Sequence, residues 1–144
     1  MLSLWEHLEA LKMAHDHFTS EVCKKHNLKQ SELDIILYLH TYPNYCTARD
    51  IVRKENLSKS HVSISLKSLE QKGLVRGEFK GTNRRTIYLN LTDASREIVN
   101  DGLEARALFA KAMLENFSEE EKKAFFEYLL KVKKNIIAHS KNRH

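Results

Sequence analysis

Residues 57–91, LSKSHVSISLKSLEQKGLVRGEFKGTNRRTIYLNL, constrain the fold of this chain more than any other stretch. Ser58 is a favoured N-cap, and Gly73 is the residue type that most often follows the end of a helix. Between them, apolar side chains recur at steps of four and three, the spacing of one helix face: Val62, Leu66 and Leu69. Residues 74–79 and 86–91 then alternate apolar and polar side chains, as strands do. The stretch therefore predicts a helix followed by a short hairpin.

A second short helix precedes this one. Thr47 is a good N-cap for a segment that carries Ile51 and Val52, and Asn56 with Leu57 makes a tight turn before Ser58. Two consecutive short helices joined by a tight turn form a helix-turn-helix. Residues 80–85, between the two strands, are then expected to be the loop of a wing.

Longer amphipathic helices are expected on both sides. A helix over residues 30–41 should end before Pro43, and Thr92 and Ser118 should each cap a helix. Three stripes show helical spacing in the outer parts of the chain: Leu4, Leu8, Leu11, His15, Phe18 and Val22; Leu103, Ala107, Ala110, Leu114 and Phe117; Phe125, Leu129, Val132 and Ile136. Such stripes need a partner surface.

We expect a mostly α (α+β) fold, because 42% of the 144 residues are apolar while only four are Gly and one is Pro. The expected organisation is an N-terminal helix over residues 1–29, a winged helix-turn-helix DNA-binding domain over 30–91 and C-terminal helices over 92–144, the outer helices forming a dimerisation domain. The N-terminus has no uninterrupted apolar run, so neither a secretory signal nor a membrane span is expected. We therefore expect the protein to be cytoplasmic.

Positive charge is concentrated in the middle of the chain. The whole chain carries a formal charge of +5, yet residues 47–91 alone carry +6 and the remainder −1. A basic patch confined to one module is typical of a surface that displaces counterions from phosphates. A solvated charged face is the alternative explanation.

Helical spacing predicts which side chains of this module face DNA. With the apolar positions in the core, one face of the second helix should be free to enter the major groove, with Ser65 at its edge: Ser58, Lys59, Ser60, His61, Ser63, Ile64 and Lys67. Ser58 is expected to act mainly as the N-cap of this helix and less as a residue that contacts bases. The lysines should bind phosphate, and the other side chains should make modest base contacts. Wing side chains should reach the minor groove or phosphates: Lys80, Thr82, Asn83, Arg84 and Arg85.

The chain resembles the MarR family of bacterial winged-helix transcription regulators over essentially its whole length. The most specific residues are Leu69, Glu70, Lys72, Gly73, Leu74 and Val75, then Arg85 and the pair Leu91 and Thr92. Asn83 stands where the family wing commonly has Asp, and Ser95 stands where glycine is common. The resemblance implies a homodimer that binds a pseudo-palindromic operator, with two recognition helices about 34 Å apart.

The resemblance also implies a repressor whose DNA binding is modulated by a small molecule. Five residues are candidates for the lining of the effector crevice, although each is an equally good core residue: Trp5, His15, Phe18, Tyr38 and Tyr42. The dimer should use apolar side chains of the outer helices: Leu4, Leu8, Leu11, Leu114, Phe117, Phe125, Leu129, Val132 and Ile136.

Other function classes have less support. The sequence has no Gly-rich phosphate loop, nucleophile elbow or HExxH motif, so an enzyme is not expected and no cofactor is assigned. Cys23 and Cys46 fit no metal spacing and are expected to be buried or idle thiols. Two alternatives stay open: a winged helix that binds a protein or has an architectural role, and a metal-responsive regulator that uses some of the eight histidines.

Overall fold

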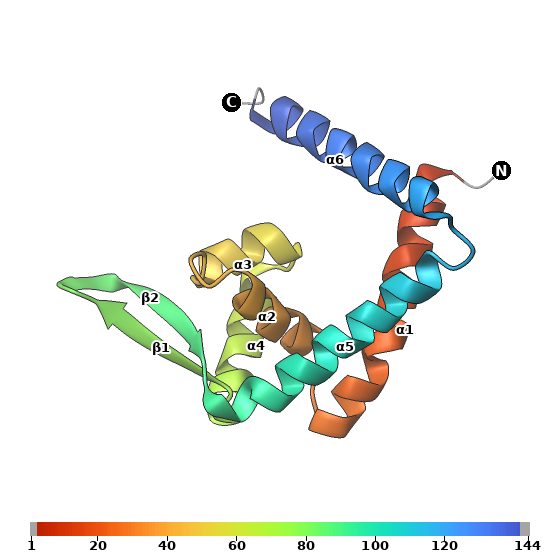
Figure 1. Cartoon of the computed structure of the whole chain (residues 1–144). Helices are drawn as coiled ribbons and strands as arrows, with labels where there is room; N and C mark the ends of the chain where they lie inside the picture. The colour runs from red at the N-terminus through yellow and green to blue at the C-terminus, as the bar shows by residue number, and fades with distance from the viewer. Residues whose placement is uncertain (1–2, 142–144) are drawn as a thin grey trace. The chain divides into compact units, whose positions relative to one another are not determined.

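The computed structural model of the chain describes residues 3–141, and these form helices and one two-stranded antiparallel hairpin (Figure 1). The elements in chain order are α1 (Leu4–His26), α2 (Gln30–Thr41), α3 (Ala48–Glu55), α4 (Lys59–Gln71), β1 (Val75–Lys80), β2 (Asn83–Leu91), a 3-10 turn (Asp93–Ser95), α5 (Arg96–Met113) and α6 (Glu119–Lys141). The expected mostly α winged helix with additional N- and C-terminal helices is confirmed. The chain divides into two compact units, 3–109 and 110–141, which are described separately.

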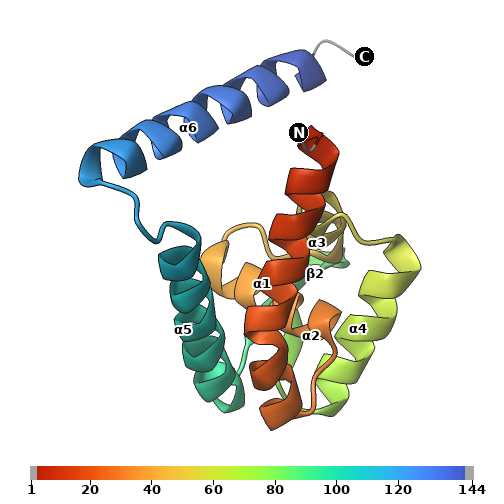
Figure 2. The ribbon, with the colours of Figure 1, turned by 90° about the vertical axis from the view of Figure 1, so that its right-hand side faces the viewer.

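The core of the first unit is built around α2. Every residue from Ser31 to Leu39 is buried, because this helix packs against α1, α3, α4 and β2. Figure 2 shows α1 and α2 lying between α4 and α5. Four consecutive or near-consecutive α2 side chains have no exposed surface: Leu33, Ile35, Ile36 and Leu37. A helix that is buried on all sides is one that other elements surround, and α2 therefore fixes the positions of its neighbours.

Local signals set the helix ends. Thr47 accepts a hydrogen bond from the Asp50 amide, and Ser58 accepts one from the His61 amide, so both act as the N-caps that the sequence predicted. Asn27 and Asn56 adopt left-handed backbone conformations at the ends of α1 and α3, where an Asn side chain tolerates a positive φ.

The expectation that Thr92 caps the next helix is wrong. The Thr92 hydroxyl donates to the Gly73 carbonyl at 2.6 Å and makes no cap bond, and a 3-10 turn intervenes before α5 begins at Arg96. Ser95, in the place where a glycine is common, is buried and donates its hydroxyl to the Thr92 carbonyl at 2.7 Å. Thr92 therefore joins the base of the hairpin to the end of α4.

The hairpin is longer than expected and its loop shorter. Strands β1 and β2 pair antiparallel from Val75 with Leu91 to Lys80 with Asn83, leaving only Gly81 and Thr82 between them. Gly81 has a φ of +57°, which a glycine adopts without strain. The predicted loop over residues 80–85 is wrong, because cross-strand hydrogen bonds extend the strands almost to the tip.

The second unit contains the last residues of α5 and all of α6. Ser118 and Glu121 form the expected capping box, each side chain accepting from the other residue's amide. Asn116 has a φ of +66° at the break between the helices. None of the described residues of α6 is buried, and its stripe includes the exposed Leu129, Val132 and Ile136. Across residues 3–141, no helix is long and apolar enough to cross a membrane.

Candidate nucleic-acid interface

Helix α4 presents one face to the core and the opposite face to solvent. Val62, Leu66 and Leu69 are buried. Seven predicted recognition residues are exposed: Ser58, Lys59, Ser60, His61, Ser63, Ile64 and Lys67. Ile64 is 64% exposed, so its side chain is free to make an apolar contact. The placement agrees with the helical spacing; which of these side chains contact DNA stays a prediction.

Ser65, expected at the edge of the face, instead lies in the core. Its hydroxyl is 3.2 Å from the hydroxyl of Ser31 on α2, and both side chains are buried. The paired hydroxyls satisfy each other, so a polar residue can occupy this position without a large desolvation cost. Ser65 therefore holds α4 against α2 and is not available to a ligand.

An open groove with a volume of about 1240 Å³ lies between helices α3 and α4. The groove is lined from both helices by Ala48, Arg49, Val52, Lys59, Ser60, Val62, Ser63, Leu66, Lys67 and Glu70. Its three basic side chains come from two different helices, and Glu70 is the single acid among the lining residues. A surface of this kind suits a polyanion.

Arg49 is the groove residue that the sequence predictions missed. It is exposed on α3, two positions before the fully buried Ile51. Two residues correspond to about 200° around a helix, so the burial of Ile51 implies an outward Arg49. That signal was present in the sequence, but the proximity of Arg49 to α4 depends on how α3 and α4 cross.

The wing is ordered by a side chain at its tip. The Asn83 carbonyl oxygen Oδ1 accepts hydrogen bonds from the backbone amides of Arg85, at 2.9 Å, and Thr86, at 3.3 Å. An Asp at this position could accept the same bonds. The replacement of the common Asp by Asn therefore keeps this turn geometry.

Cations on the wing have different surroundings. The Arg84 guanidinium lies over the Phe79 ring, 5.4 Å from its centroid, and the Lys80 ammonium lies 4.2 Å from the centroid of Tyr88. These cation–π contacts hold both side chains along the hairpin. Thr82 and Arg85 are exposed at or near the tip.

The five crevice candidates do not come together. Tyr38 and Tyr42 stack with ring centroids 5.1 Å apart, whereas His15 and Phe18 pack on Phe109 at 5.9 and 5.5 Å. Trp5 is 75% exposed on the first turn of α1. The predicted group is therefore divided among different parts of the first unit.

One of these parts is a pocket of about 480 Å³, lined by Tyr38, Tyr42, Tyr45, Asp50, Arg53 and Lys54. The Tyr38 hydroxyl donates to the Tyr45 carbonyl at 2.6 Å, and burial raises the pKa of Tyr38 to about 12. The Lys54 ammonium lies 4.7 Å from the centroid of the Tyr42 ring. The pocket combines aromatic walls with two basic side chains, a lining that suits a planar anion.

A histidine and two carboxylates meet where α1 approaches α5. One ligand atom from each of His26, Glu97 and Asp101 lies within 4.8 Å of the others, although His26 is more than 70 positions from both acids in the sequence. Lys25 already pairs with Asp101 at 2.9 Å and with Glu97 at 3.1 Å. Hydrogen bonds from His26 and Lys25 lower the pKa of Asp101. The arrangement is therefore explained as an ion-pair cluster that joins the two helices.

Both cysteines are free thiols, as expected. Cys46 is buried, and Cys23 is half-buried with its sulfur 3.7 Å from the Gln30 side-chain oxygen. Burial, followed by the neighbouring Asp34, raises the pKa of the Cys23 thiol. A raised pKa reduces the thiolate fraction and with it the reactivity towards oxidants.

Comparison with known proteins agrees with this geometry. A family model described as the MarR family matches residues 26–86. The chain is similar to the HTH-type transcriptional regulator YwhA of Bacillus subtilis, with 31% identity over 97 residues that cover 67% of this chain and 68% of that protein. It is also similar to the regulator YdgJ of the same species, with 30% identity over 109 residues, 76% of this chain and 66% of that protein. The matches span about two thirds of the length of both relatives.

The fold also matches solved structures. A MarR family transcriptional regulator from Listeria monocytogenes, solved in complex with a 26mer DNA, superposes with a TM-score of 0.82. The match covers 100% of this chain and 98% of the other, with 18% sequence identity. At this identity the similarity establishes the fold.

Proposed function

The chain belongs to the MarR family of transcriptional regulators, and from this membership we propose that it represses transcription by binding a pseudo-palindromic operator as a homodimer. Its relatives are HTH-type transcriptional regulators, which agrees with the expectation that the chain is not an enzyme. The proposed DNA-contacting elements are the exposed face of α4, which enters the major groove, and the wing, which enters the minor groove.

The groove between α3 and α4 is the observation that carries this proposal. It combines Arg49, Lys59 and Lys67 with the small hydroxyls of Ser60 and Ser63. Small side chains let the helix approach base edges closely, and the cations flanking them neutralise phosphates. Within the described chain, Lys59, Lys67 and Arg85 form no ion pair, so their charges are available to DNA.

Exposed apolar side chains support the homodimer. In the first unit, Leu4, Leu8 and Leu11 on α1 are all at least 41% exposed. In the second unit, the exposed apolar residues of α6 include Leu129, Val132 and Ile136, with Phe117 just before the helix. Leu114 and Phe125 are partly buried. Apolar stripes on exposed helices are typical of interaction surfaces, and a second copy would place two winged helices on one DNA site.

The effector is proposed to be a small aromatic anion. The pocket of Tyr38, Tyr42 and Tyr45 supports this choice, because its aromatic walls are accompanied by Arg53 and Lys54. An effector shifts DNA binding only if it prefers one state of the protein. Titration with benzoate-type acids, followed through tyrosine fluorescence and operator affinity, tests this part of the proposal. Binding that is unchanged in Arg53→Gln would contradict the assignment of the pocket.

Selection of bound sequences from random duplex DNA tests the main proposal and returns the operator. Affinity for the selected duplex is then measured against salt concentration. The logarithm of the binding constant should fall steeply with the logarithm of salt, by about 0.9 for each phosphate neutralised. A flat dependence, or failure to select any duplex, would refute DNA binding and favour a protein-interaction role.

The contribution of the wing is tested by substituting both arginines. Arg84→Ala with Arg85→Ala should weaken operator binding by at least about tenfold and leave the dimer intact, because both side chains are exposed on the hairpin. Arg96→Ala, an exposed arginine outside the proposed interface, is the matched control. Equal affinity of the double variant and the control would refute the assignment of the wing. Sedimentation velocity reports whether the dimer is retained.

A further inference from the structure

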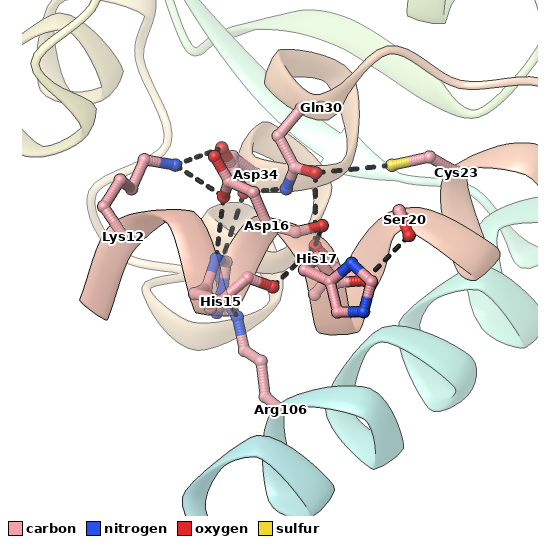
Figure 3. Close-up of polar contacts among 10 residues, drawn as sticks. Lys12, His15, Asp16, His17, Ser20, Cys23, Gln30, Asp34 and Arg106 are labelled. Atoms are coloured by element: carbon pink, nitrogen blue, oxygen red, sulfur yellow. Dashed lines mark hydrogen bonds and ion pairs between the residues drawn. The ribbon is translucent and has the colours of Figure 1, made fainter. Parts of the chain in front are cut away.

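A network of polar side chains joins α1, α2 and α5 inside the first unit (Figure 3). His15 lies at its centre and is only 19% exposed. Arg106 on α5 reaches His15 with its Nε atom 3.1 Å from Nε2, and the other imidazole nitrogen is 3.0 Å from Asp16 Oδ1. Lys12 contacts the same Asp16 oxygen at 2.7 Å. The single imidazole therefore links α5 to α1.

Chemistry fixes the protonation of His15 in this arrangement. The Nε atom of arginine carries a hydrogen and can only donate, so His15 Nε2 must accept and must be unprotonated. The second nitrogen, Nδ1, then carries the proton and donates to Asp16. The contact between Arg106 and His15 exists only while the imidazole is neutral in its Nδ1–H form.

Protonation of His15 would replace this attraction with repulsion. A hydrogen on Nε2 would point at the Arg106 guanidinium, whereas the Nδ1–H bond to Asp16 would remain. Arg106 has an alternative partner, since its Nη2 is already 3.9 Å from Asp34 Oδ1 on α2. Once His15 Nε2 can no longer accept a hydrogen bond, Arg106 would thus move from α1 towards Asp34 on α2.

Charged groups on four helices surround the imidazole of His15. Lys12 and Arg106 oppose a positive imidazole, whereas Asp16 on α1, Asp34 on α2 and Glu55 on α3 favour it. Histidine is the side chain whose charge ordinarily changes between about pH 5 and 8. Because cations and carboxylates both surround the imidazole, the ion pairs can rearrange after His15 gains a proton, and each buried charge still has a partner of opposite sign.

We propose that His15 is a proton-sensitive positioning residue, whose neutral form ties α5 to α1 and whose protonation releases Arg106 and weakens operator binding. The inference rests on the proposed function for its effect on DNA. The rearrangement can affect DNA binding because Asp34 lies on α2, which contacts the recognition helix α4 directly. Ser31 on α2 pairs with Ser65 on α4, and Glu32 on α2 accepts a hydrogen bond from Ser68 on α4. A change of partner at Asp34 therefore acts on the helix that positions the recognition face.

Operator affinity measured from pH 8.0 to 5.5 at constant ionic strength tests the effect. All proteins carry His61→Gln, because a second histidine on the exposed recognition face would confuse the assignment of any pH response to His15. The His61→Gln protein should lose affinity on the order of tenfold as pH falls. Adding His15→Gln should remove the pH dependence and preserve affinity at pH 8.0, since Gln does not titrate and its side-chain oxygen can accept from Arg106. The matched control, His26→Gln, should keep the pH response.

A pH response unchanged by His15→Gln would overturn the proposal, as would a response removed by His26→Gln instead. A second measurement is independent of DNA. Long-range proton–nitrogen correlation spectra of the full chain distinguish the two imidazole tautomers, and His15 should be the Nδ1–H form at pH 8.0. An Nε2–H form would overturn the inference even if the operator experiment gave the expected trend. Failure to bind any duplex, with the Nδ1–H form observed, would refute the proposed function and leave the imidazole link established.

Discussion

The ammonium of Lys72, in the residue after the last turn of α4, lies 3.1 Å from the carboxylate of Glu32, which is only 2% exposed on α2. The Ser68 hydroxyl donates to the same carboxylate at 2.8 Å, and the Lys29 amide donates at 2.9 Å. Lys72 also donates to the Asn27 carbonyl at 2.9 Å. The end of the recognition helix is therefore anchored to α2 through one nearly buried acid.

Removal of the lysine should destabilise the fold. Lys72→Met leaves the Glu32 carboxylate without its cation, and the free energy of unfolding should fall by about 1–3 kcal/mol at pH 7. Burial alone would raise the pKa of Glu32. Hydrogen bonds from Lys29, Ser68 and Lys72 nevertheless hold this pKa below its ordinary value. A lowered folded-state pKa contributes stability above the unfolded pKa of about 4.3, and this is lost as pH falls.

Urea denaturation at pH 7 and pH 4 measures this loss. The difference between Lys72→Met and the unsubstituted chain should be smaller at pH 4, because Glu32 without its lysine takes up a proton at a higher pH than the paired carboxylate. Lys67→Met, on the exposed face of the same helix, should change stability little at either pH. A loss of equal size at both pH values would show that packing of the lysine stem, and not its charge, stabilises this contact.

Local signals explain why much of the fold could be predicted. Helix α2 occupies residues 30–41 as expected, and Thr47, Ser58 and Ser118 all accept the predicted cap bonds, because each depends on residues within one turn. The outward face of α4 also follows from spacing alone. Ser65 is the exception, since its burial depends on a hydroxyl partner 34 positions away.

Features formed by distant residues could not be predicted. The length of the hairpin depends on cross-strand pairing, and the hydroxyl of Thr92 is used by the Gly73 carbonyl 19 positions earlier. The contact of His15 with Arg106 joins residues 91 positions apart. Sequence spacing within an element indicates which face a residue occupies, whereas these contacts depend on how elements pack.

Glu55 should destabilise the fold at neutral pH. It lies at the C-terminal end of α3, where the helix dipole disfavours negative charge, and burial followed by the neighbouring Asp34 raises its pKa. A raised folded-state pKa contributes stability below the unfolded pKa that is lost as pH rises through the folded pKa. Glu55→Gln should therefore increase the free energy of unfolding at pH 7 by about 0.3–1 kcal/mol.

Denaturation from pH 4 to pH 7 checks this sign. The stabilisation by Glu55→Gln should appear as pH rises above about 4.3 and be absent below it. Glu104→Gln, an exposed position on α5, is the matched control and should show no such trend. Destabilisation by Glu55→Gln at pH 7 would mean that the Glu55 charge is favourable to the fold.

Asn83 should matter for DNA binding more than for stability. Asn83→Ala removes the acceptor for the Arg85 and Thr86 amides, so the wing tip becomes less ordered before binding. The loss of about 1 kcal/mol corresponds to roughly fivefold weaker operator binding. Asn83→Asp keeps the acceptor and should preserve the turn. Fluorescence anisotropy measures the affinities, and an Asn83→Ala protein that binds as tightly as the original would show that the wing needs no such ordering.

Gly102 should be required for the packing of α5 on α2. A Cβ at this position would lie 2.9 and 3.0 Å from the two terminal methyl groups of Leu37, which has no exposed surface and little room to move. Alanine is favoured over glycine within a helix by about 1 kcal/mol, but overpacking a core costs about 1–3 kcal/mol. Gly102→Ala should therefore lower the free energy of unfolding on balance.

A second background separates the two effects. Leu37→Ala removes both methyl groups that a Cβ at Gly102 would meet, and it should itself destabilise the core by about 2–5 kcal/mol. Adding Gly102→Ala to Leu37→Ala should then raise stability, because the clash is gone and the helix propensity of alanine remains. Thermal and urea unfolding of the four proteins give this coupling. If Gly102→Ala lowers stability equally in both backgrounds, contact with Leu37 is not the reason for glycine at this position.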